Sequence, residues 1–320
     1  MRRSLIGIGI IAVGMVALAG WFARKPLLAH YYAHGLEAAA DDVEPNYEAI
    51  ARLGEPAVSP LLTVLRKDGT ASERAAKALG MIVERLPEDD PRVTNLAGQL
   101  AASFGDFSAR GRREVLQQVV EPLLTRCPAS RDSCREIVKQ LLKDSEPTNR
   151  LAAVPFAMRR DIGLAPEVVL MLSDGKVEVR RSAMLAVGSL PETIPSDDLL
   201  HWLHDPDKTV RDLCEAALKL RGLRDKDVRM ARLVSDESFL KRLEVIRYLP
   251  NDNQIDPQVW LQRLSQDPVP AVRAAAARAG MQSEWQLDVD FRGRVQEMAN
   301  SDPDGTVRQI AGHLLAQKSR

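Results

Sequence analysis

Apolar side chains return every three or four positions in short blocks along most of this chain, and polar turns separate the blocks. Residues 197–203, DDLLHWL, and residues 257–264, PQVWLQRL, are two such blocks. This spacing places the apolar residues on one stripe of an α-helix. Asp or Ser precedes the blocks and Pro suits their first turn, so both mark helix starts. Because no stretch alternates with the two-residue period of a strand, the pattern predicts an all-α fold.

The helical blocks belong to a repeat, in which an acidic turn is followed by Val-Arg and a helix of small residues. Arg180 and Arg211 stand 31 residues apart, and twice 31 residues separate Arg211 from Arg273. Arg242 occupies the position midway, behind another acidic turn. Further copies of the motif arginine, some of them looser, are Arg74, Arg112, Arg150 and Arg308. Even internal spacing of this kind is the signature of a stacked repeat protein.

The pattern D-x-x-x-x-V-R-x-x-A-x-x-A-L-G resembles HEAT repeats, in particular the bacterial HEAT-like kind first associated with phycobilisome lyases. The resemblance covers residues 46–318. It implies antiparallel helix pairs stacked into an α-solenoid of about seven repeats. In that family the motif Asp and Arg pair between neighbouring turns and fix the stacking. The resemblance therefore implies a structural, repeat-stacking role for Asp174, Arg180, Asp205, Arg211, Arg242, Asp267, Arg273, Asp302 and Arg308.

The N-terminus carries an uncharged apolar run from Leu5 to Phe22, with arginines before it and Arg24 and Lys25 after it. As a helix, this run would be roughly 27 Å long, close to the ~30 Å of hydrocarbon in a bilayer. The pattern predicts a short tail at 1–4, a transmembrane helix at 5–22 and a juxtamembrane helical linker at 23–45. The HEAT-repeat solenoid is expected at 46–320.

A cleaved signal peptide is the alternative interpretation of the same run. Ala17-Leu18-Ala19 matches a small-residue cleavage site after a basic start and an apolar stretch. Both interpretations place the solenoid on the exported side, because the charge bias keeps the arginine-bearing start in the cytoplasm. We therefore expect a single-pass cell-membrane protein with a periplasmic or extracytoplasmic solenoid. A secreted or periplasmic protein, cut near Ala19, is the alternative.

Two cysteines flank a predicted helix turn. Cys127 closes one helix and Cys134 enters the next, so in an exported domain they could form a disulfide across that turn. Two reduced thiols are the alternative. A metal site is not predicted, because no second Cys pair or nearby His completes four ligands.

Charge and motifs argue against several function classes. Lys plus Arg and Asp plus Glu both total 44, so the chain lacks the basic excess of a general nucleic-acid binder. Phosphate-binding loops, serine-hydrolase elbows and zinc-protease motifs are missing, and we expect no catalytic residues and no small-molecule cofactor. Trp202, Trp260 and Trp285 fall in or beside second helices of repeats, where they could form an interaction surface or pack in the core.

These features together favour a membrane-tethered, non-enzymatic scaffold. An extended repeat array offers a large contact surface and lacks the single deep pocket of most enzymes. The expected partner is a protein or peptide bound on the solenoid surface, together with the membrane itself. The resemblance also leaves a lyase-like or chaperone-like maturation factor as an alternative function.

Overall fold

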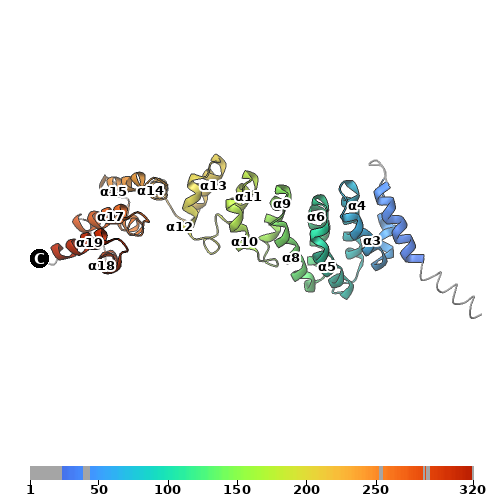
Figure 1. The fold of residues 1–320 in the computed structure, drawn as a ribbon. Helices are drawn as coiled ribbons and strands as arrows, with labels where there is room; N and C mark the ends of the chain where they lie inside the picture. The colour runs from blue at the N-terminus through green and yellow to red at the C-terminus, as the bar shows by residue number, and fades with distance from the viewer. Residues whose placement is uncertain (1–23, 39–43, 252–254, 284, 286–288, 319–320) are drawn as a thin grey trace, which may run out of the picture. The chain divides into compact units, whose positions relative to one another are not determined.

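In a computed structural model, the regular structure of the described residues is helical throughout. The structure describes residues 24–38, 44–251, 255–283, 285 and 289–318. Within these ranges, α-helices alternate with short 3-10 and π segments and no strand occurs (Figure 1). The all-α prediction is confirmed, and the arrangement is consistent with an α-solenoid.

The predicted membrane helix at 5–22 and the tail at 1–4 lie outside the described residues. Among the helices that are described, none is both long enough and apolar enough to cross a bilayer.

The chain divides into two compact units, residues 1–186 and 187–320. The first unit contains a helix over 24–38 and then α2 (Tyr47–Leu53), α3 (Glu55–Leu65), α4 (Thr70–Arg85), α5 (Pro91–Ser103), α6 (Ala109–Val115), a π segment (Leu116–Val120), α7 (Glu121–Arg126), α8 (Arg131–Leu141), α9 (Pro147–Ala157), α10 (Ala165–Leu170) and α11 (Val177–Val187). The second contains α12 (Ser196–Leu199), the 3-10 segment η5 (Leu200–His204), α13 (Lys208–Leu220), α14 (Asp225–Val234), α15 (Phe239–Tyr248), α16 (Pro257–Leu264), α17 (Pro270–Gln282), α18 (Val289–Ser301) and α19 (Gly305–Lys318).

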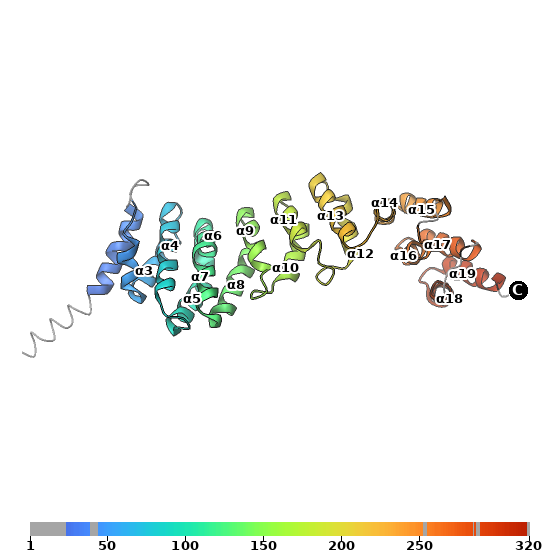
Figure 2. The ribbon, with the colours of Figure 1, turned by 180° about the vertical axis from the view of Figure 1, so that it is seen from behind.

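In the first unit the helices form two rows. Helices α4, α6 and α9 follow one another in one row, and α3, α5 and α8 follow one another in the other (Figures 1 and 2). Helix α4 packs against α3 within its pair and against α6 in the next pair. The core between the rows is built from small and aliphatic side chains such as Ala75, Leu79, Val83 and Leu100, all fully buried. Alanines at these positions let helices approach closely.

Two helix contacts in the first unit are tight enough to require glycine. A Cβ on Gly80 of α4 would lie 2.3 Å from the Gln118 carbonyl oxygen, in the π segment of the next pair. A Cβ on Gly111 of α6 would lie 2.3 Å from the Leu65 carbonyl oxygen at the end of α3. The backbone at these two places packs at a distance that no side chain permits.

In the second unit, α17 is the central helix. It packs against α15, against α19 and against α16, its pair partner. Helix α14 joins η5 to α15 and α16. Helices α13 and α15 lack packing comparable to that between α15 and α17, although they occupy neighbouring repeats.

The predicted linker at 23–45 includes the described helix over 24–38. Its Ala29, Ala33 and Leu36 are buried, at a three- to four-residue spacing. The guanidinium group of Arg74 in α4 donates a hydrogen bond to the Leu36 carbonyl oxygen over 3.2 Å. Because of these contacts, the segment packs on the first repeat along one face.

Candidate binding edge

From residue 144 onward, each repeat begins with a turn that its own Asp and Arg close. In the turn at 267, the Asp267 carboxylate accepts a hydrogen bond from the Val269 backbone N–H over 2.8 Å. Arg273, six residues on, donates from Nη1 to the Asp267 carbonyl oxygen over 2.8 Å. The next turn repeats this geometry with Asp302 and Arg308. The six-residue spacing of Asp and Arg in the motif therefore lets the arginine side chain, in the first turn of a helix, bond the carbonyl oxygen of the aspartate that precedes the helix.

The same arginines also bind the acid of the following repeat. Arg273 Nε and Nη2 lie 2.8 and 2.7 Å from the two oxygens of Asp302. Arg242 binds Asp267 in the same bidentate way, at 2.6 and 3.0 Å. The first unit contains the pairs Arg112–Asp144 and Arg150–Asp174. We call these four pairs the Asp–Arg ladder, and each pair is one rung.

The rungs of the second unit are buried. The Arg273 and Asp302 side chains are 9% and 2% exposed, and those of Arg242 and Asp267 are 10% and 5% exposed. The hydrogen bonds from Arg273 lower the pKa of Asp302 although burial opposes this, and those to Asp302 raise the pKa of Arg273. Arg273 and Asp302 therefore both stay charged, and removal of either leaves a buried charge without its partner.

One rung that the repeat spacing leads one to expect is missing from the second unit. Arg211 donates to the carbonyl oxygens of its own turn, at Asp205 and Pro206, over 2.7 and 2.9 Å. Among the described residues it forms no ion pair with Asp236, the acid of the next turn, which pairs with Lys241 instead. This gap coincides with the missing packing between α13 and α15.

The remaining predicted stacking residues lie in the same turns. Asp174 accepts both bonds from Arg150, an arginine that the repeat spacing singled out but that the predicted stacking set lacked. Arg180 donates to the carbonyl oxygen of Asp174 over 2.9 Å, and Arg308 donates to that of Asp302. Asp205 caps its own turn by accepting from the Asp207 N–H.

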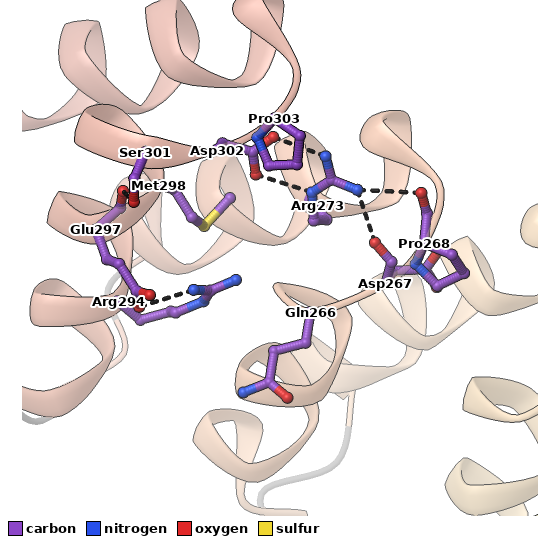
Figure 3. Close-up of a pocket in the computed structure, with 10 residues that line it drawn as sticks. All are labelled: Gln266, Asp267, Pro268, Arg273, Arg294, Glu297, Met298, Ser301, Asp302 and Pro303. Atoms are coloured by element: carbon purple, nitrogen blue, oxygen red, sulfur yellow. Dashed lines mark hydrogen bonds and ion pairs between the residues drawn. The ribbon is translucent and has the colours of Figure 1, made fainter.

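Two hollows open beside the rungs of the second unit. The first, of about 440 Å³, lies between the 266–268 turn and α18, with the Arg273–Asp302 rung in its wall (Figure 3). In Figure 3, Arg273 stands on one side of this hollow, and Gln266 and Arg294 stand on the other. The second, of about 390 Å³, lies beside the Arg242–Asp267 rung. Both hollows are lined by Gln266, Asp267 and Pro268, so they are adjacent.

We call the rim of these hollows the binding edge. It consists of Asp197, His201, Ser235, Arg263, Gln266, Pro268, Arg294, Glu297 and Ser301.

The charges on the binding edge are matched. Arg294 bonds Glu297 over 2.7 Å and also donates to the Ser265 carbonyl oxygen, and Arg263 forms an ion pair with Asp197. Between these pairs lie the neutral amide of Gln266 and the hydroxyls of Ser235 and Ser301. The Gln266 amide can both donate and accept hydrogen bonds, as a peptide backbone requires. The hydroxyls of Ser235 and Ser301 donate to backbone carbonyl oxygens of their own helices and can still accept from a peptide N–H. The described residues hold no group of three His, Cys, Asp or Glu side chains placed to bind a metal.

The three tryptophans differ in position. Trp260 is only 3% exposed, and the Arg263 guanidinium lies 5.2 Å from its ring centroid. Of the two alternatives that the sequence left open for Trp260, its burial favours core packing over an interaction surface. Trp202 is half-buried. Its ring packs in a T-shaped arrangement against that of His201, which belongs to the binding edge, with 5.6 Å between the ring centroids. Trp285 is half-buried.

The predicted disulfide is not formed in this structure. Cys127 and Cys134 are free, buried thiols, and the Cys127 sulfur lies 3.3 Å from the Thr94 hydroxyl of α5. Burial raises the pKa of Cys134 to about 12, and the same cause raises that of Cys214 to about 12. Thiols with such high pKa values are poor nucleophiles.

Comparisons with known proteins do not assign this chain to a family. No family model and no curated protein matches the chain. Among solved structures, an engineered protein is similar over 91% of this chain and 84% of its own, with 17% sequence identity and a TM-score of 0.33. A likeness at this level assigns neither family nor function.

Proposed function

We propose that this protein is a HEAT-type solenoid, tethered to a membrane by residues 5–22, which acts as a non-enzymatic scaffold. Its partner is an extended segment of another protein, bound along the binding edge. The observation that carries this proposal is the pair of adjacent hollows that share Gln266, Asp267 and Pro268. A single linear ligand can fill both.

The spacing of the hollows suits a short peptide. Neighbouring helices pack about 8–10 Å apart, so one repeat step corresponds to about three residues of extended chain. A segment of about six residues therefore spans both hollows. Its backbone would bond Gln266, Ser235 and Ser301, and its apolar side chains would meet Leu200, Val234 and Met298 in the walls.

The carboxylates of the binding edge are better suited to binding than to catalysis. The carboxylates of Asp197 and Glu297 are already paired with arginines, and the nearby rungs are closed. A general acid or base needs a side chain free to exchange a proton with a substrate. Tethering by residues 5–22 would raise the local concentration of the scaffold for partners at the same membrane.

Site-specific photo-crosslinking tests this proposal. A benzophenone amino acid replaces Gln266, which both hollows share, or Gln282, which is exposed at the end of α17 and serves as a matched control. We expect a protein adduct in native membranes from position 266 and none from position 282. The partner identified by mass spectrometry should then bind the purified full chain, and Gln266→Arg should weaken that affinity while Gln282→Arg leaves it unchanged.

Equal adducts at positions 266 and 282 would overturn the binding edge as the site. So would a partner affinity that neither Gln266→Arg nor Gln282→Arg changes. A tetrapyrrole absorbance in protein purified from membranes would instead favour the lyase-like alternative.

A further inference from the structure

The helix over 24–38 has two faces, and only one of them packs on the protein. Ala29, Ala33 and Leu36 are 2%, 6% and 1% exposed and form the packed face. At the end of this face, Lys67 binds Glu37 over 2.7 Å. These contacts fix the rotation of the helix about its own axis.

The opposite face is exposed and carries apolar and cationic side chains. Arg24, Leu27, Tyr31 and His34 follow one another at steps of three, four and three residues, so they share one side of the helix. Leu27 is 69% exposed and Tyr31 is 72% exposed. We call these four residues the outer face.

Large apolar side chains at such exposure mark a contact surface when they gather beside cations. Lys25, next to the outer face, is a further exposed cation. The one carboxylate of the described helix is Glu37, whose side chain is 25% exposed and bound to Lys67. The exposed surface of the helix is therefore cationic and apolar with no free anion, which complements a layer of phosphate headgroups above hydrocarbon.

The position of the helix in the chain indicates the same surface. The apolar run 5–22 ends two residues before Arg24. Tyrosine is favoured at the boundary between headgroups and hydrocarbon, where its ring is buried and its hydroxyl stays hydrated.

We infer that the outer face lies on the headgroup layer of the bilayer and holds the first repeat against the membrane. This inference rests on the proposed tether at residues 5–22. In this arrangement Leu27 and Tyr31 enter the interface and Arg24 and Lys25 bind phosphates. The packed face meanwhile transmits that orientation to α4 through Arg74 and to the turn before α4 through Lys67.

Fluorescence quenching by labelled lipid tests the inference on the full chain. Tyr31→Cys and the matched control Tyr248→Cys, which replaces a tyrosine 48% exposed in the second unit, each receive an environment-sensitive dye. The native cysteines are buried and leave the introduced thiol as the reactive one. The protein is reconstituted in phosphatidylcholine–phosphatidylglycerol vesicles that contain a headgroup spin label.

We expect strong quenching and a blue-shifted emission at position 31, and neither at position 248. Replacement of Arg24 and Lys25 by Gln should reduce the quenching at position 31 without changing that at 248. Equal signals at the two positions would overturn the inference. If the chain floats with the vesicles while position 31 stays unquenched, the outer face is refuted and the tether survives; if the chain does not float, both fail.

Discussion

A single arginine in this protein holds two turns of the chain at once. Arg273 closes its own turn through the carbonyl oxygens of Asp267 and Pro268, and it binds the next turn through both oxygens of Asp302. With the guanidinium in place, the Asp302 side chain is only 2% exposed, so the pair is largely shielded from solvent. For Arg273 and Asp302, this geometry is the pairing between neighbouring turns that the resemblance implied.

Arg273→Ala should therefore destabilise the chain strongly. Loss of one partner of a buried pair costs about 3–5 kcal/mol, because the other charge stays buried. Arg278→Ala, an exposed position on the same helix, should change stability by less than about 0.5 kcal/mol. Urea unfolding followed by circular dichroism compares the two variants. Equal midpoints would show that the rung contributes nothing.

Acid should weaken the ladder. Hydrogen bonds from Arg150 and Arg273 lower the pKa values of Asp174 and Asp302 below their ordinary 3.8. A carboxyl group whose pKa falls on folding stabilises the folded state above its unfolded pKa, and this stabilisation is lost as the pH falls through the folded pKa. We expect the urea midpoint to hold from neutral pH to about pH 5 and to drop below about pH 4. Asp302→Asn should flatten that drop, and a wild-type midpoint that does not fall below pH 4 would contradict the effect.

The thiols should be unreactive in the folded protein. Burial keeps the pKa of Cys134 and of Cys214 at about 12, so a thiol reagent at pH 8 meets neither an exposed sulfur nor a thiolate. Titration with Ellman's reagent should detect no thiol in the native protein and all 3 cysteines after unfolding in urea. A single thiol after unfolding would show that Cys127 and Cys134 are oxidised together.

At the scale of elements, backbone proximity sets the spacing of helices in the first unit. Gly80 of α4 faces the Gln118 carbonyl oxygen, and an added Cβ would lie 2.3 Å from it. Backbone cannot retreat as a flexible side chain does, so α4 and the following pair would have to separate.

Gly80→Ala should lower stability by about 1–3 kcal/mol through this overpacking. Gly98→Ala in α5 is the matched control, because nothing lies within 4 Å of its added Cβ. That control should raise stability by up to about 1 kcal/mol through helix propensity. Thermal unfolding of the two variants measures the contrast, and a Gly80→Ala protein as stable as the control would refute the close contact.

Helices could be predicted from the sequence because their signals are local. The apolar spacing and Pro257 mark α16, which spans Pro257–Leu264 in the structure. The block 197–203 was also correctly placed as helical, but it is split between α12 and the 3-10 segment η5. Periodicity does not resolve such a tightening, since three- and four-residue steps fit both helix types.

The binding edge could not be predicted, because it depends on contacts between repeats. Gln266 and Arg294 come from different repeats, and no motif links them. The position of Trp260 stayed open for the same reason: a tryptophan among Leu and Val fits either a surface or a core, and the packing of its neighbours decides. Only the ladder spacing hinted at this region, since the motif marks the turns beside which the hollows open.

At the scale of the whole molecule, the order of rungs divides the second unit. The rungs Arg242–Asp267 and Arg273–Asp302 join α15, α17 and α19 into one row. Arg211 makes no such pair with Asp236, and α13 connects to the row through α14 and η5. Buried ion pairs therefore join the repeats from α15 to α19, and in the described part of the chain none of them joins α13 to that row.

Hydrogen exchange should reveal this difference. Backbone amides in α14 and the turn before it, residues 221–234, should exchange faster than those of α16 and α17, because local opening there breaks no buried ion pair. Mass spectrometry of exchanged peptides measures the two rates. Equal exchange rates across residues 208–282 would show that the absent rung does not lower the local stability of this segment.

Because this rung is absent, we expect the segment between α13 and α15 to be the most easily deformed part of the second unit. When a ligand binds to the second unit, its backbone should change conformation there first. Separation of neighbouring repeats from α15 to α19 would instead break a buried ion pair. The first hollow is lined only by residues between 266 and 303, so its shape should persist when the unit deforms. The second hollow is lined also by Asp197, Leu200 and His201 on the other side of the absent rung, so its width should change.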